Sequence, residues 1–121
     1  MLTIRLATEE DLPRILELYR ELAITTSQVE ASQRPSPDDY LQVFADICDA
    51  PGHELFVAEY EREVVGTMVL LIVPNLSHGA CPWALVENLI IDYRHRSRGF
   101  GRVLVDYAIA EPGRRDAIGS C

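Results

Sequence analysis

The most informative stretch of this sequence reads Arg96-Ser97-Arg98-Gly99-Phe100-Gly101. It lies between an apolar segment typical of a strand, residues 89–92, and a segment with helical spacing that begins at Val103. A strand that leads through a glycine-rich turn into a helix leaves several backbone amides pointing at one spot, where the helix dipole also favours negative charge. Glycine lets an oxyanion approach the backbone, and arginine adds charge-assisted hydrogen bonds. The stretch therefore predicts a phosphate-binding loop.

Two other phosphate-binding motifs do not fit this loop. A P-loop ends in Gly-Lys-Ser/Thr, and the chain contains no lysine. A Rossmann fingerprint needs a third glycine or an alanine at position 104, which is Leu104, and it follows the first strand rather than a late one. The remaining alternative is a solvent-exposed, arginine-rich turn that binds no ligand.

The composition describes one acidic domain with a local cluster of positive charge. A chain of 121 residues has room for one compact domain, and its 48% of apolar and 25% of charged residues are typical of globular proteins. A formal charge of −8 argues against nucleic acid as a partner. Four of the eleven arginines nevertheless fall within one nine-residue stretch without an acid. They are Arg94, Arg96, Arg98 and Arg102.

The remaining composition argues against a membrane or metal role. No apolar run approaches the roughly 20 residues that cross a bilayer, and the amino terminus lacks the features of a signal peptide. We therefore expect a cytoplasmic protein without a membrane partner. The three cysteines are odd in number and form no CxxC pair, which fits neither a disulfide framework nor a zinc site.

Apolar periodicity predicts an ordered series of strands and helices. Alternating or continuous apolar residues predict strands at residues 2–7, 55–60, 64–73 and 83–92. Three- and four-residue spacing predicts helices at residues 12–23, 37–50 and 103–110, the first two with capping residues at Thr8 and Ser36. Loops are expected at residues 24–35 and 74–82.

The glycine-rich stretch matches Arg/Gln-x-x-Gly-x-Gly/Ala, the acetyl-CoA signature of the GNAT superfamily of N-acetyltransferases, and the chain resembles that family. Leu89-Ile90-Ile91-Asp92 followed by Tyr93-Arg94-His95 looks like the family's strand and approach to the loop. The order of elements also matches from residue 3 to about residue 110. The resemblance implies an α/β (α+β, GNAT-like) fold with a mixed, mainly antiparallel sheet flanked by about three helices.

The resemblance also implies a co-substrate and the residues that hold it. Acetyl-CoA would donate the acetyl group to a primary amine on a small molecule, with no metal involved. The backbone of Leu89, Ile90 and Ile91 would pair with the pantetheine arm. Backbone amides would hold the pyrophosphate, and they belong to Arg96, Ser97, Arg98, Gly99, Phe100, Gly101 and Arg102.

Catalysis in the family is usually direct attack of a neutral amine on the thioester, with a carboxylate or water accepting the proton. We expect Glu87 to be this base, because it stands two residues before the presumed acetyl position at Leu89 and on the same strand face. A solvated carboxylate, or one that holds the incoming ammonium group, is the alternative. Strand alternation places Asn88 on the opposite face in a structural role. His78 and His95 are weaker candidates for proton transfer.

The sequence departs from the family after its third helix, where a full member continues with further strands and a helix. Residues 112–121 are polar, contain helix breakers and are too short for those elements. We therefore expect a GNAT-like domain at residues 1–111 and a disordered or aberrant polar tail at residues 112–121, as in a truncated member. An uncovered strand edge would then either pair with a second copy of the chain or leave the chain unstable alone.

Three functions remain open at the level of sequence. The first is N-acetyltransferase activity, which truncation would put in doubt. The second is a non-catalytic acyl-CoA or nucleotide sensor that has kept the phosphate loop, and the third is an interaction module or inactive fragment without a ligand. Replacing Gly99 and Gly101 would abolish binding in the first two cases and change only local stability in the third.

Overall fold

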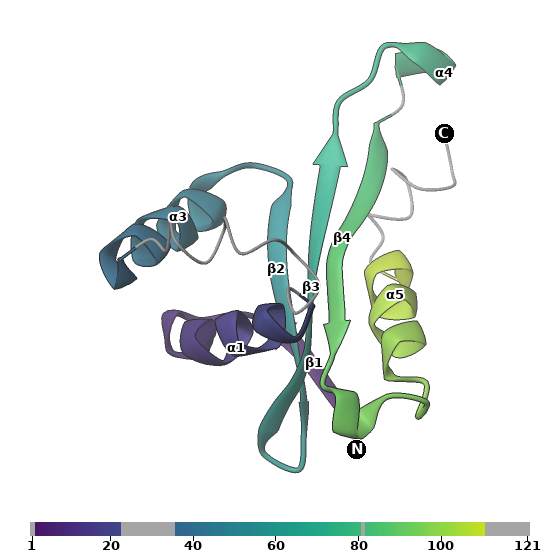
Figure 1. Ribbon diagram of the computed structural model, residues 1–121. Helices are drawn as coiled ribbons and strands as arrows, with labels where there is room; N and C mark the ends of the chain where they lie inside the picture. The colour runs from purple at the N-terminus through teal and green to yellow at the C-terminus, as the bar shows by residue number, and fades with distance from the viewer. Residues whose placement is uncertain (1, 23–35, 81, 111–121) are drawn as a thin grey trace.

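The computed structural model describes residues 2–22, 36–80 and 82–110 of the chain, and Figure 1 shows their arrangement. Four antiparallel strands form one sheet in the order β1-β2-β3-β4. They are β1 (Leu2–Leu6), β2 (His53–Tyr60), β3 (Glu63–Val73) and β4 (Trp83–Ile91). The α-helices are α1 (Leu12–Leu22), α3 (Pro37–Asp49), α4 (Ser77–Ala80) and α5 (Phe100–Ala110), and the 3-10 turns are η1 (Glu9–Asp11) and η3 (Tyr93–His95).

The expected α/β, GNAT-like arrangement of a mainly antiparallel sheet with about three helices is confirmed, and all pairs of neighbouring strands in the described part of the sheet are antiparallel. The loop predicted at residues 74–82 differs, because it contains the single turn of α4. The predicted loop at 24–35 lies outside the described residues, and so does the predicted tail at 112–121. No helix in the described part of the chain is long and apolar enough to cross a membrane.

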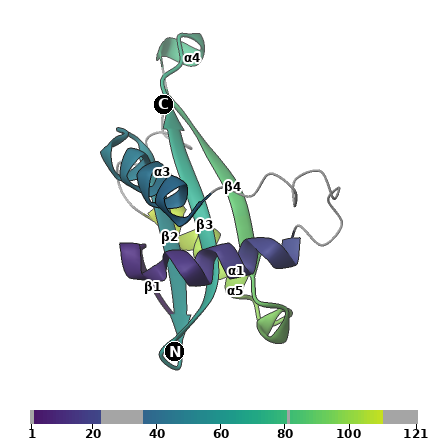
Figure 2. The ribbon, with the colours of Figure 1, turned by 60° about the vertical axis from the view of Figure 1, so that its left-hand side comes forward.

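Helices cover both faces of the sheet. α1 and α3 lie on one side and α5 lies on the other, as Figures 1 and 2 both show. The core is accordingly divided into two clusters of buried side chains. The cluster beneath α5 contains Phe56, Ala58, Met68, Leu70, Leu104 and Ala108, and the cluster beneath α1 contains Ile15, Leu55, Val57 and Val69. Burying one large apolar side chain contributes roughly 1.5 to 3 kcal/mol, so these clusters hold the helices on the sheet.

The start of α1 is fixed by Asp11, which is buried at the end of η1. Its carboxylate accepts hydrogen bonds from the Thr8 backbone N–H (2.8 Å) and from the Thr8 hydroxyl (3.1 Å). The Asp11 carboxylate therefore caps the backbone N–H of Thr8, and the Thr8 hydroxyl donates its hydrogen bond to the same carboxylate. Arg5 of β1 donates two hydrogen bonds to the same carboxylate, which holds the pKa of Asp11 below its usual range despite burial.

The predicted cap of α3 is confirmed. The Ser36 hydroxyl accepts a hydrogen bond from the Asp39 N–H (3.3 Å), and Asp39 accepts one from the Ser36 N–H (2.9 Å). Phe44 is the buried residue of this helix. Cys48, which stands four residues after Phe44, is exposed.

A bulge interrupts β4 at its two polar residues. Val69 of β3 pairs with Glu87 of β4, and Thr67 of β3 pairs with Ile90 of β4. Two steps along β3 therefore correspond to three steps along β4. The additional residue is Asn88, whose φ of +52° lies in the left-handed region. Asparagine tolerates this region better than most residues because its short side chain can hydrogen-bond locally. One residue of β3 therefore faces two of β4, which is a β-bulge.

The bulge changes the side of the sheet to which the neighbouring side chains point. Glu87 lies opposite Val69, which packs in the cluster beneath α1, and directly opposed residues project from the same face. Leu89 lies on the α5 side, since a Cβ at Gly101 of α5 would be 3.9 Å from Cδ2 of Leu89. The expectation that Glu87 and Leu89 share a strand face is therefore wrong, because simple alternation fails across a bulge.

Candidate active site

The predicted phosphate-binding loop forms the entry to α5. The first hydrogen bond of the helix runs from the Val103 N–H to the Gly99 carbonyl (3.1 Å), so the amides of Phe100, Gly101 and Arg102 have no acceptor within the helix. Gly99 has a φ of +81°, a conformation that an L side chain rarely adopts, and the space around its Cα is open. The loop therefore presents free amides at the positive end of a helix, as an anion site requires.

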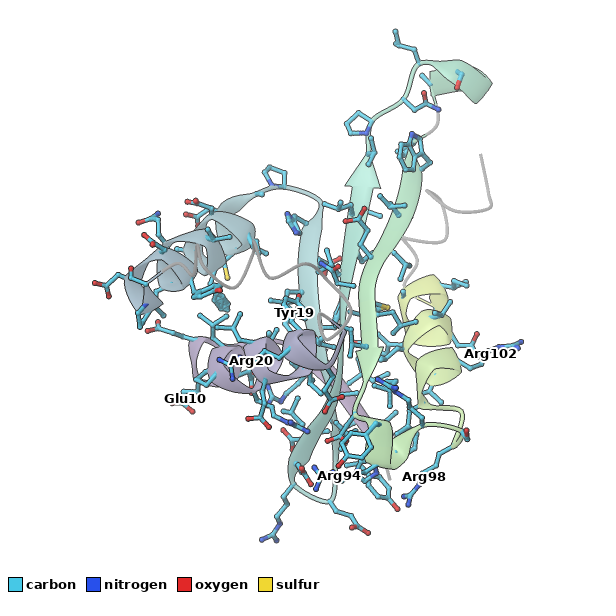
Figure 3. All side chains as sticks on the ribbon, viewed as in Figure 1. Glu10, Tyr19, Arg20, Arg94, Arg98 and Arg102 are labelled. Atoms are coloured by element: carbon cyan, nitrogen blue, oxygen red, sulfur yellow. The ribbon has the colours of Figure 1, made fainter. Side chains whose placement is uncertain are left out.

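The four arginines of this region divide into two pairs with different roles. The Arg96 Nε donates to the Ile91 carbonyl (2.9 Å), and its guanidinium lies 3.8 Å from the Glu21 carboxylate. The side chain of Arg94 is likewise bound to acids. All four side chains are exposed, but Arg98 lies over the Tyr60 ring and Arg102 lies 3.7 Å from the Asp106 carboxylate at the surface. Figure 3 shows Arg102 pointing outward from α5. The first pair fastens the loop, while the second pair makes surface contacts that a bound anion can replace.

A buried carboxylate, Asp92, connects the loop to the rest of the protein. It is 1% exposed and accepts hydrogen bonds from the backbone N–H of Arg94 (2.9 Å), from the Arg94 guanidinium (2.8 Å) and from Arg14 of α1. Glu63 of β3 binds the Arg94 guanidinium at 2.8 Å. The bonds from Arg94 and Arg14 hold the pKa of Asp92 well below its usual range, although burial acts in the opposite direction.

Aromatic rings support the other side of the loop. The ring of Tyr60 lies 5.8 Å from that of His95 and 5.3 Å from that of Phe100, measured between centroids, and the Arg98 guanidinium lies 5.9 Å from the Tyr60 ring. Nδ1 of His95 is buried and has no hydrogen-bond partner among the described residues. These contacts give His95 a packing role beneath the loop.

The two parts of the predicted acetyl-CoA site lie next to each other. Besides its approach to Leu89, a Cβ at Gly101 would be 4.0 Å from Cγ1 of Ile91, so the start of α5 adjoins the end of β4. β4 is also the edge strand of the described sheet. Ile90 is buried, and Leu89 is 38% exposed. The structure thus brings the strand residues 89–91 and the loop residues 96–102 together.

Glu87 and Asn88 lie at the bulge, on the side of the sheet that α1 covers. The Glu87 side chain is exposed. The Asn88 side chain is also exposed, and its influence on the hydroxyl of Tyr19 in α1 lowers the pKa of that hydroxyl, against the larger effect of burial. Asn88 therefore lies on the same side of the sheet as Glu87. The expectation that strand alternation places the two on opposite faces is wrong, because Asn88 is the additional residue of the bulge. His78 lies in α4, at the far end of β3 from the loop.

Sequence reasoning did not identify Tyr19 as part of this site. It belongs to the apolar stripe of α1 and packs against the cluster beneath that helix, which is how its spacing was interpreted. Burial raises the pKa of Tyr19 above its ordinary value, and the influence of Asn88 opposes this shift. The sequence signal for Tyr19 is its hydroxyl on an otherwise apolar stripe of the helix, because a buried tyrosine hydroxyl needs a hydrogen-bond partner.

Comparison with protein families identifies the family of the chain. A model of the acetyltransferase (GNAT) family matches residues 6–118. The chain belongs to the GNAT family, whose members generally transfer acyl groups from acetyl-CoA or related thioesters. The resemblance noted in the sequence is thereby confirmed.

Solved structures agree with this assignment. The "Putative acetyltransferase from Agrobacterium tumefaciens str. C58" is 37% identical, with a TM-score of 0.72 over 98% of this chain and 74% of that one. A transcriptional regulator from Bacillus halodurans C-125 is 29% identical, with a TM-score of 0.78 over 96% of this chain and 77% of that one. A Trypanosoma brucei acetyltransferase, 24% identical with a TM-score of 0.74 over 98% of this chain and 79% of that one, supports the fold alone.

Proposed function

We propose that this chain is an N-acetyltransferase that moves an acetyl group from acetyl-CoA to a primary amine by direct attack. The observation that carries the proposal is the set of free amides at the start of α5, directly beside the edge strand β4. The amine nitrogen would form a bond to the thioester carbonyl carbon, the C–S bond would break, and the CoA thiolate would leave. The amine proton passes to a base on the protein or to water.

The residues present fit acetyl-CoA. Its pyrophosphate suits the amides of Phe100, Gly101 and Arg102, with Arg98 adding positive charge from the exposed part of the loop. The pantetheine arm carries two amide groups, which suit hydrogen bonding to the free edge of β4 at residues 89–91. The bulge interrupts the strand one residue earlier, where the thioester would lie and where a backbone amide can polarise its carbonyl.

The acceptor would approach from the α1 side of the sheet, where Glu87 is exposed. Acetyl-CoA on the α5 side and acceptor on the α1 side would meet at the bulge. Binding of the two substrates on opposite sides suits Glu87 as the base better than binding on one shared face would. The Glu87 carboxylate then lies beside the incoming amine and not beside the CoA. The acceptor class is a small-molecule primary amine, and the expected cytoplasmic location belongs to the same proposal.

Thermal unfolding with and without acetyl-CoA tests the proposal. A ligand that binds only the folded state at 100 times its Kd stabilises that state by about 2.7 kcal/mol, so the unfolding midpoint should rise by several degrees. Gly99→Ala should lower the affinity for acetyl-CoA tenfold or more, because a left-handed alanine costs about 1 to 2 kcal/mol and the loop shifts to relieve it.

Gly79→Ala is the matched control for this experiment. Gly79 also has a positive φ (+73°) with open space around its Cα, but it lies in α4, at the far end of β3 from the loop, so binding should persist. Dephospho-CoA and ATP serve as ligand controls. If acetyl-CoA leaves the midpoint of the cooperatively folded chain unchanged, the proposal is wrong. If the midpoint rises but no amine in a panel of amino acids, polyamines, amino sugars and peptides is acetylated, the protein is a non-catalytic acyl-CoA-binding module.

We also propose that the chain forms a homodimer through the β4 edge. The outer side of β4 is unpaired among the described residues, and Trp83 at its start is 44% exposed. Pairing along residues 83–86 would cover this apolar end and leave residues 89–91 open to the co-substrate. Light scattering should therefore give twice the mass of the monomer, while a stable monomer at micromolar concentration would contradict the dimer and leave the enzymatic proposal intact.

A further inference from the structure

The outer edge of β4 presents a short series of backbone hydrogen-bonding groups. The Asp92 N–H donates to the Val65 carbonyl of β3 (2.7 Å), and in a planar trans peptide the carbonyl before it, that of Ile91, points the opposite way. Ile90 pairs with β3 and directs its own backbone groups there. By the same rule, the Leu89 carbonyl and the Ile91 N–H point outward. Residues 89–91 therefore present two carbonyls and one N–H on the side of β4 that no described strand covers.

Arg96 occupies the last of these groups. It ends η3, where the chain turns from β4 toward α5 (Figure 1), and its Nε donates a hydrogen bond to the Ile91 carbonyl (2.9 Å). An extended ligand beside β4 thus finds the Leu89 carbonyl and the Ile91 N–H ahead of a carbonyl that is already bound. The part of the edge that is open to pairing ends at Ile91, directly before the phosphate-binding loop.

The charge of Arg96 is directed toward α1. Its Nη2 lies 3.8 Å from Oε2 of Glu21 in the last turn of that helix, and this oxygen is buried with no hydrogen-bond partner among the described residues. A buried carboxylate oxygen without a hydrogen bond is stabilised by a nearby cation. Glu21 therefore holds the Arg96 guanidinium beside β4, and the positive charge that an anion at the loop would meet belongs to other residues.

The bond from Arg96 removes a competing way to pair with β4. An unbound Ile91 carbonyl would stand beside the Ile91 N–H as a closely spaced acceptor and donor on one residue, which an extended chain binds with both groups of one of its own residues. A ligand bound in this way would lie closer to the loop than one bound to the Leu89 carbonyl and the Ile91 N–H. Blocking the Ile91 carbonyl leaves one register.

We propose that Arg96 is a positioning residue for the co-substrate, whose Nε ends the strand-like pairing of the pantetheine arm at Ile91 and thereby fixes where along β4 the thioester lies. This inference rests on the proposed acetyl transfer. It gives the Arg96 side chain a role that differs from binding phosphate, because it acts through the Ile91 carbonyl and through its hydrogen bond, not its charge.

Two substitutions separate the hydrogen bond of Arg96 from its charge. Glutamine carries its side-chain nitrogen on Cδ, as arginine carries Nε, so Arg96→Gln keeps a donor at this position and removes the charge. Arg96→Met has a similar length and removes both. We expect kcat to fall about tenfold in Arg96→Met, since a thioester displaced by about 1 Å can react up to about 100-fold more slowly, and less than threefold in Arg96→Gln. Arg20→Gln, at an exposed position on α1 (Figure 3), is the matched control and should leave kcat unchanged.

Binding of ADP separates positioning from support of the loop. ADP carries a pyrophosphate and lacks the pantetheine arm, so its Kd should differ less than twofold among the wild type, Arg96→Met and Arg96→Gln. If Arg96→Met weakens ADP binding tenfold, Arg96 supports the loop or binds phosphate, and the inference is overturned. It is also overturned if Arg96→Met keeps full kcat, or if Arg96→Gln loses as much kcat as Arg96→Met.

A measurement without any ligand separates the inference from the proposed function. In NMR spectra of the free protein, the carbonyl carbon signal of Ile91 reports its hydrogen bond. Arg96→Met should move this signal, whereas Arg96→Gln and Arg20→Gln should leave it near its wild-type position. An unmoved signal in Arg96→Met would overturn the inference and leave the proposed function intact. A wild type that binds acetyl-CoA but acetylates no amine contradicts the proposed function, and the inference is then decided by the Ile91 signal and the ADP titrations.

Discussion

Replacing Glu87 by glutamine should slow acetyl transfer by about 100-fold, because general base catalysis typically contributes 100- to 10,000-fold and glutamine cannot accept the proton. The effect should appear in kcat. The Kd for acetyl-CoA should change less than twofold, since Glu87 projects from the α1 side of the sheet, away from the strand segment and loop proposed to hold the co-substrate. Steady-state kinetics with the best acceptor from the amine panel, combined with titration by acetyl-CoA, measures both quantities.

Glu10→Gln is the matched control, since Glu10 is an exposed acid at the opposite end of α1 from Tyr19 (Figure 3). It should leave kcat and KM unchanged. If Glu87→Gln raises KM for the amine and spares kcat, Glu87 holds the ammonium group and does not take its proton. An unchanged kcat and KM would show that the carboxylate is a solvated surface group and that water alone accepts the proton.

The sequence predicted the secondary structure of this protein well because local signals agree with one another. The hairpin of β2 and β3 has its apolar residues on both faces, and the helices have both capping residues and apolar stripes. The bulge at Asn88 was beyond such reasoning. Glu87 and Asn88 interrupt the apolar pattern of β4, but a period of two residues cannot represent an additional residue. Strand alternation therefore assigned wrong faces to the residues around the bulge.

The candidate site was predicted to the extent that it is continuous in sequence. The loop at 96–101 carries its own signal, since glycines, arginines and a helix start stand together. The partners that hold the site come from distant elements. Arg14, for example, meets Asp92 across an interval of 78 residues. The sequence also does not separate arginines that bind the backbone of β4, such as Arg96, from arginines that lie over a surface ring, such as Arg98.

The ion network around Asp92 connects α1 to the carboxyl end of β4. Arg14 of α1 binds Asp92 directly after the strand, where η3 leads into the loop. The Asp92 N–H also donates to the Val65 carbonyl (2.7 Å), which fastens this end to β3. These bonds keep β4 and the loop proposed to bind the co-substrate in a fixed relation, so that loss of the Asp92 carboxylate should affect stability and binding together.

Asp92→Asn should lower the free energy of unfolding by about 3 kcal/mol, because it leaves the guanidinium groups of Arg14 and Arg94 without their buried counter-charge. For a chain of this length, the unfolding midpoint should fall by roughly 10 °C. Asp106→Asn is the matched control, because Asp106 is exposed and its ion pair with Arg102 spans 3.7 Å at the surface. It should change the free energy of unfolding by less than about 0.5 kcal/mol.

The pH dependence of this difference identifies its cause. The pKa of Asp92 is lowered in the folded state from an ordinary value of 3.8, so the charged carboxylate stabilises the fold fully above that value and progressively less as the pH falls below it. Chemical denaturation of the wild type and Asp92→Asn should therefore show a constant difference from about pH 5 to pH 7, and a shrinking one below about pH 4. A difference independent of pH would mean that asparagine disturbs packing or hydrogen bonding, and that the negative charge of Asp92 does not hold the network together.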